Sequence, residues 1–77
     1  MNTFKQSAIE ILKKAGTPLH YSEITRLALE AGILETEGAT PEASMYAQIT
    51  VDIKNKGDGS DFVKTAPGTF GLNTNKK

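Results

Sequence analysis

The 77-residue chain contains no cysteine and no tryptophan, and it has a single histidine. Without cysteine it can form neither a disulfide nor a thiolate zinc site, so packing alone must stabilise a domain of this size. Its longest apolar runs, such as Leu27-Ala28-Leu29, are far shorter than the roughly 20 apolar residues of a transmembrane helix. The N-terminus also lacks the apolar block of a signal peptide, so we expect a soluble protein with no membrane partner.

The sequence has no net charge either, because nine basic residues balance nine acidic residues. The two signs are separated, however. Residues 1–53 carry four basic and seven acidic residues, whereas residues 54–77 carry five basic and two acidic residues, so an acidic body precedes a basic end. With 38% hydrophobic and 23% charged residues, the composition is that of one globular domain. We expect this domain at residues 1–73, followed by a polar tail at residues 74–77.

Cap and stop signals divide the first two thirds of the chain into helices. Thr3 and Gln6 have the spacing of a capping box, and Gly16 is suited to end the helix that follows. Ser22 is the predicted cap of a second helix, and the start signal Thr40-Pro41-Glu42 predicts a third. Together the signals predict helices near residues 3–15, 22–31 and 41–56.

Each predicted helix has an apolar stripe that faces a common core. Tyr46 lies at the edge of the third stripe, where its ring can either fill the boundary of the core or stack on a base. Its helical angle favours burial. The stripes consist of Phe4, Ala8, Ile11, Leu12 and Ala15, then Ile24, Leu27, Ala28 and Ala31, and then Met45, Ile49 and Ile53.

The last third of the chain predicts a β-hairpin. Phe62-Val63-Lys64-Thr65 and Thr69-Phe70-Gly71-Leu72 have the pattern of two strands, and Pro67-Gly68 suits the centre of a type II turn. We expect a short extended segment around Leu19 to pair with the edge of this hairpin, and Phe70 to lie in the core. The order of elements predicts an α+β winged helix, and a three-helix bundle with an unrelated hairpin is the alternative.

Several short motifs, taken in their order and spacing, resemble the HARE helix-turn-helix family over almost the whole chain. This winged-helix family occurs in restriction endonucleases, in Additional sex combs-like chromatin proteins and, in more diverged form, in the delta subunit of bacterial RNA polymerase. The resemblance implies a DNA-associated adaptor that works with RNA polymerase or with a fused nuclease or other domain, in the bacterial cytoplasm or the eukaryotic nucleus. The motifs are Pro18-Leu19-His20-Tyr21, Glu23-Ile24, Gly38, Thr40-Pro41-Glu42-Ala43, Met45, Ala47-Gln48-Ile49, Asp52-Ile53 and Pro67-Gly68-Thr69-Phe70.

Two features depart from the simplest expectation for such a domain. Asp61 stands before Phe62, where the family often has a basic residue, and Asp58 adds a second acid to the same turn. Both acids oppose phosphate binding at the base of the wing. The connection Gly32–Ala39 is longer than the roughly 3–4-residue turn of a simple helix-turn-helix, which argues against the simplest bacterial repressor class.

Few residues have the pattern that catalysis or metal binding requires. The lone His20 has no partner for a metal site or a catalytic pair, and we expect it to make a structural hydrogen bond. Glu35 and Glu37 are typical of a solvated loop rather than of a cation site. Asp52 lies next to the core, where we expect it to cap or pair with a group inside the domain. The sequence therefore predicts no enzyme, no cofactor and no metal.

The outward face of the third predicted helix is the candidate site for duplex DNA. Its short polar groups, amides and cations are types that read base edges or contact phosphates, and three lysines predict weak, mainly electrostatic binding. Ala47 and Val51 form a small apolar strip that suits the methyl group of thymine or 5-methylcytosine, or packing under the wing or a partner. The alternative is a protein-interaction adaptor that uses the acidic surface of the first two helices. The predicted contacts are Ser44, Ala47, Gln48, Val51, Lys54, Asn55, Lys56 and Lys64.

Overall fold

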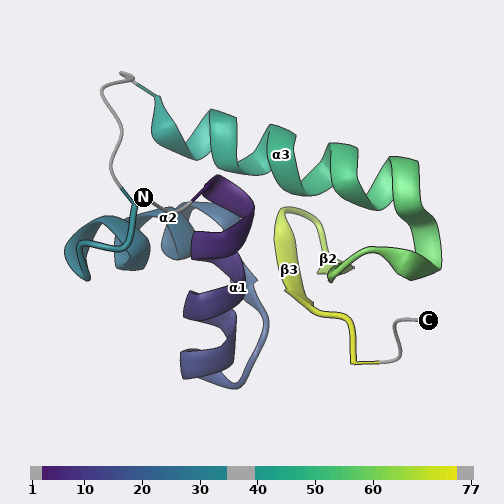
Figure 1. Ribbon diagram of the computed structural model, residues 1–77, viewed down its shortest axis with the longest axis horizontal. Helices are drawn as coiled ribbons and strands as arrows, with labels where there is room; N and C mark the ends of the chain where they lie inside the picture. The colour runs from purple at the N-terminus through teal and green to yellow at the C-terminus, as the bar shows by residue number, and fades with distance from the viewer. Residues whose placement is uncertain (1–2, 35–39, 75–77) are drawn as a thin grey trace.

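The computed structural model describes residues 3–34 and 40–74. Three α-helices pack beside a three-stranded antiparallel sheet, in the order predicted for a winged helix (Figure 1). The predicted α+β architecture is therefore confirmed. The elements are α1 (Phe4–Ala15), β1 (Leu19–His20), α2 (Tyr21–Glu30), α3 (Pro41–Lys56), the 3-10 helix η1 (Gly57–Gly59), β2 (Phe62–Ala66) and β3 (Thr69–Leu72).

The predicted capping box at the start of α1 is confirmed. The Thr3 hydroxyl accepts a hydrogen bond from the Gln6 N–H at 3.1 Å, and the Gln6 side chain accepts one from the Thr3 N–H at 3.3 Å. Gly16 caps the other end with a positive φ of 70°, and its N–H donates to the Leu12 carbonyl. The helix therefore begins and ends where its own sequence signals place it.

The predicted cap of α2 is wrong. The helix begins at Tyr21, and His20 rather than Ser22 occupies the N-cap position. The Nδ1 atom of His20 accepts a hydrogen bond from the Ser22 N–H at 3.2 Å, which is the bond that a serine or aspartate cap makes. Capping preferences favour Ser, Thr, Asp and Asn, so the sequence rule selected the hydroxyl. His20 nevertheless has the structural hydrogen-bonding role predicted for it.

The third helix, α3, spans the predicted residues, but its start differs in detail from the prediction. Within the described part of the chain, the Thr40 side chain makes no capping hydrogen bond. Its carbonyl instead accepts from the N–H groups of Ala43 and Ser44. Pro41 stands in the first turn, where its missing N–H leaves no bond unmade, and Gly57 ends the helix with a positive φ of 54°.

The hairpin closes onto the segment between α1 and α2. β3 lies in the middle of the sheet, between β1 and β2, and both pairings are antiparallel. Leu19 pairs with Phe70, as predicted. A bulge between Lys64 and Ala66 shifts the register of β2, and the sequence pattern did not predict it. Gly68 has a φ of 73°, which the second central residue of a type II turn requires.

The core lies between the three helices and the inner face of the sheet. The predicted stripes are confirmed except near the ends of the helices. Ala15 and Ala31 are exposed, because each follows the last turn that packs on the core. Phe4, Leu27 and Ile53 are half-buried. The buried apolar residues are Ala8, Ile11, Leu12, Ile24, Ala28, Leu34, Met45, Ile49, Phe62 and Phe70.

Phe70 provides a direct test of this core, because its side chain is 0% exposed. Phe70→Ala should lower the free energy of unfolding by about 3–5 kcal/mol, which is most of the stability of so small a domain. Urea unfolding followed by circular dichroism measures the change. A variant as stable as the wild type would show that Phe70 does not anchor the core.

Candidate nucleic-acid interface

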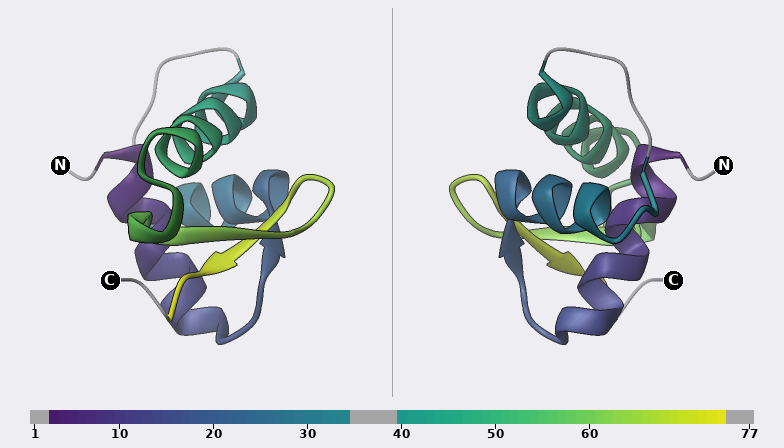
Figure 2. Two further views of the ribbon diagram at one scale, coloured as in Figure 1. Left: turned by 90° about the vertical axis from the view of Figure 1, so that its right-hand side faces the viewer. Right: turned by 90° about the vertical axis from the view of Figure 1, so that its left-hand side faces the viewer.

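The candidate interface is the outward face of α3 together with the adjoining wing. α3 lies across one end of the domain, with α1 and α2 on its inner side and the hairpin alongside (Figure 2). Met45 and Ile49 point from α3 into the core and are fully buried. All eight predicted contact residues, seven on α3 and Lys64 on β2, are exposed to solvent. The fold therefore leaves the predicted face open.

A small hollow lies on this outward face. It has a volume of about 160 Å³ and is lined by Ala47, Gln48 and Val51. Val51 is 53% exposed, so it packs neither under the wing nor in the core. The hollow brings two apolar side chains beside one amide, and these are the groups that contact a thymine methyl and an adenine edge.

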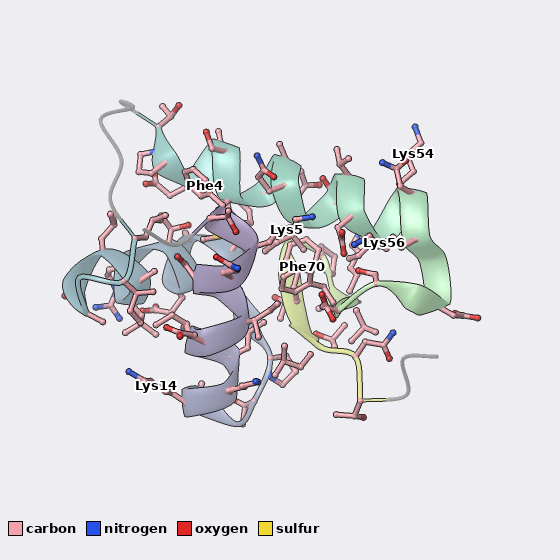
Figure 3. All side chains as sticks on the ribbon, viewed as in Figure 1. Phe4, Lys5, Lys14, Lys54, Lys56 and Phe70 are labelled. Atoms are coloured by element: carbon pink, nitrogen blue, oxygen red, sulfur yellow. The ribbon has the colours of Figure 1, made fainter. Side chains whose placement is uncertain are left out.

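The three lysines predicted to contact phosphate differ in their surroundings. The Nζ atom of Lys56 lies 3.1 Å from the Asp52 carboxylate and forms an ion pair with it. Lys54, in contrast, points away from the domain (Figure 3). Among the described residues, neither Lys54 nor Lys64 forms an ion pair. The charges of Lys54 and Lys64 are therefore more available to a phosphate than the charge of Lys56.

The ion pair of Lys56 belongs to a buried network around Asp52. The Asp52 side chain is 3% exposed, accepts a hydrogen bond from the Ser60 hydroxyl at 2.6 Å and pairs with Lys5 at 3.3 Å. Burial raises the pKa of Asp52, but the bonds from Ser60, Lys56 and Lys5 outweigh burial and lower the pKa to about 2. The prediction that Asp52 pairs inside the domain is confirmed.

The base of the wing is held by further polar contacts. The Phe62 N–H donates to the Ser60 hydroxyl at 3.1 Å, and the Asn73 amide donates to the carbonyls of Asp58 and Ser60 at 3.0 Å each. Asp58 and Lys64 line the same groove, which has a volume of about 660 Å³. An acid therefore lies near the cation of the wing and weakens its attraction for phosphate.

Tyr46 is not buried, contrary to the prediction. Its side chain is 40% exposed. The ring packs on Tyr21, with centroids 4.9 Å apart, and on Phe70, with centroids 5.9 Å apart. The angle of an ideal helix placed Tyr46 at the edge of the core, but it cannot show how far α2 and the wing cover that edge. Tyr46 is thus a surface residue beside the candidate interface, which the predicted contact set omitted.

The remaining candidates from the sequence carry no site in the described residues. Glu35, Glu37 and Gly38 lie outside those residues. Within residues 3–34 and 40–74, no three His, Cys, Asp or Glu side chains gather as they would around a metal ion. None of the described helices combines the length and the apolar sequence that a membrane span requires.

The three helices and the antiparallel sheet make this domain a winged helix-turn-helix. The HARE-HTH family model, described as the helix-turn-helix domain of ASXL proteins and restriction endonucleases, matches residues 2–74. The chain therefore belongs to the HARE-HTH family, a DNA-binding type of helix-turn-helix domain that is generally not catalytic. No curated protein and no solved structure gives a significant match.

The Asp52 network predicts a specific pH dependence of stability. Because folding lowers the pKa of this carboxyl from 3.8 to about 2, its contribution is complete above about pH 4 and is lost as the pH falls towards 2. Asp52→Asn should lower the free energy of unfolding by about 2 kcal/mol at neutral pH. The difference from the wild type should shrink between about pH 4 and about pH 2.

Urea unfolding of both proteins at a series of pH values measures this difference. Asp58→Asn removes an exposed acid outside the network and is the matched control, which should keep the pH dependence of the wild type. A difference between Asp52→Asn and the wild type that stays constant down to about pH 2 would contradict the stabilising role of the carboxylate.

Proposed function

We propose that this domain binds duplex DNA weakly, with α3 in the major groove and the wing against the flanking backbone. The observation that carries the proposal is the open outward face of α3, which has the exposed Lys54 near one end and Lys64 on the adjoining strand. In winged helices a recognition helix reads the groove while cations around it contact phosphates. Membership in a DNA-binding type of family supports the same assignment.

The binding should be weak, because few charges favour it. Lys54 and Lys64 attract phosphate, whereas Asp58 lines the same groove as Lys64 and opposes it. The chain as a whole carries no net charge. Non-specific dissociation constants of DNA-binding proteins run roughly from 10⁻⁴ to 10⁻⁶ M at physiological salt, and we expect this domain at the weak end of that range.

The number of phosphates neutralised sets the salt dependence of binding. The logarithm of affinity should fall with the logarithm of salt concentration with a slope of about −1.8 for two lysines, or about −2.7 for three. Because Asp52 already holds Lys56 at 3.1 Å, we expect the smaller slope. Fluorescence anisotropy titrations of a labelled duplex, at low and at moderate salt, measure it.

Two variants and a control connect this slope to particular side chains. Lys64→Ala and Lys54→Ala should each make the slope shallower by about 0.9. Lys14→Ala, at the end of α1 that lies away from α3 in Figure 3, should leave it unchanged. Salt-independent affinity, or affinity that survives removal of Lys54 and Lys64 together, would contradict duplex binding and favour a protein partner.

The hollow at Ala47, Gln48 and Val51 supports a finer proposal, that the domain reads a methyl group of thymine or 5-methylcytosine. Replacing thymine by uracil, or 5-methylcytosine by cytosine, should weaken binding to the wild type about fourfold, which corresponds to one buried methyl group. Val51→Ser should bind both members of each pair alike. Competition titrations and thermal unfolding test this proposal. Lower thermal stability of Val51→Ser with an unchanged DNA preference would show that Val51 packs and does not read methyl groups.

A protein-interaction adaptor is the second candidate function, and the surface of α2 favours it. Leu29 is 39% exposed and borders a hollow of about 330 Å³ that Glu23, Arg26 and Glu42 also line. Arg26 is already paired with Glu23 and Glu30, so the surface keeps an acidic character around an exposed apolar side chain. Such a surface suits a basic, partly apolar segment of RNA polymerase or of a fused domain.

A further inference from the structure

An aromatic ladder of His20, Tyr21, Tyr46 and Phe70 runs along the flank of α3 that faces α2 and the wing. The ring centroids are 4.4 Å apart between His20 and Tyr21, 4.9 Å between Tyr21 and Tyr46, and 5.9 Å between Tyr46 and Phe70. Phe70 is fully buried, whereas Tyr46 is 40% exposed. The ladder therefore continues the hydrophobic core to the surface and ends there in an exposed tyrosine ring.

The ladder is held firmly on the side of the wing. The Tyr21 N–H donates to the Gly68 carbonyl at 3.0 Å, which ties the start of α2 to the hairpin turn. A β-carbon at Gly68 would lie 2.8 Å from Nε2 of His20, so only glycine allows this close approach. Because its neighbours already hold the Tyr46 ring, little conformational freedom is lost when a ligand stacks on that ring.

The exposed ring lies on the same stripe of α3 as a cation. Tyr46, Thr50 and Lys54 follow one another at four-residue spacing, which aligns them along the helix. Tyr46 and Lys54 are about 12 Å apart along the axis. Lys64 pairs with Phe70 across the sheet, so a second cation lies at the buried end of the ladder. Aromatic rings that stack on bases, with cations that follow the backbone, are the components that bind unpaired nucleotides.

We propose that the exposed face of Tyr46 stacks on an unpaired base, so that the domain prefers DNA with a bulged or flipped nucleotide to a fully paired duplex. Paired bases offer only their edges to a groove, whereas an unpaired base offers its face to a ring. The inference rests on the proposed function, because Lys54 and Lys64 hold the duplex that flanks the unpaired base.

The test compares two duplexes of one sequence, one fully paired and one with a single unpaired 2-aminopurine nucleotide. The wild type should bind the second duplex on the order of tenfold more tightly and should quench the 2-aminopurine fluorescence, because the base stacks on the ring. Tyr46→Phe keeps the ring and should retain the preference and the quenching. Tyr46→Leu keeps an apolar side chain without a ring and should lose both.

The outcomes separate this inference from the proposed function. Equal affinity of the wild type for the two duplexes, or a preference that survives in Tyr46→Leu, overturns the stacking role and leaves salt-dependent duplex binding standing. Absence of binding to either duplex overturns both. Thermal unfolding checks that each variant folds. If Tyr46→Leu does not fold, the preference and quenching of the wild type and Tyr46→Phe still decide, because an unquenched base overturns the inference.

Discussion

The position of the wing relative to α3 depends on the buried carboxylate of Asp52. This side chain accepts a hydrogen bond from Ser60 and pairs with Lys5 of α1 and Lys56 at the end of α3. The Ser60 hydroxyl also accepts the N–H of Phe62, the first residue of β2. A buried charge is strongly unfavourable unless it is paired and hydrogen-bonded, and here three donors surround one carboxylate. The network therefore fixes how the wing leaves α3, and with it the spacing between Lys54 and Lys64.

The same network gives neighbouring lysines different roles. Lys56 is held by Asp52, whereas Lys54 points into solvent, so the charge offered to DNA is smaller than the basic end of the sequence indicates. A signal for this difference is present in the sequence, since Asp52 and Lys56 are four residues apart, a spacing that permits an ion pair on one helix. Tyr46 carried no comparable signal. Its exposure depends on how α2 and the wing approach α3, which no helical angle contains.

Local sequence signals predicted most of the fold, because several element boundaries have their own chemical marker. Gly16, Pro41 and Gly57 mark helix ends through their backbone preferences, and the helices begin or end at these residues. The His20 cap and the bulge after Lys64 could not be predicted in this way. The cap depends on the orientation of one imidazole beside the wing, and the bulge depends on how β3 pairs with two neighbours at once. Both are properties of the assembled domain rather than of a segment.

The pairing of β1 with β3 has a consequence for how the chain folds. Leu19 and Phe70 are partners in the sheet although 51 positions separate residues 19 and 70. Closing a loop of this length lowers the entropy of the chain, and contacts between such distant residues slow folding. The hairpin of β2 and β3 can form locally, but its attachment to β1 must wait for the two ends of the domain to meet. Loop-closure entropy therefore favours a folding order in which the helices associate first and the sheet closes last.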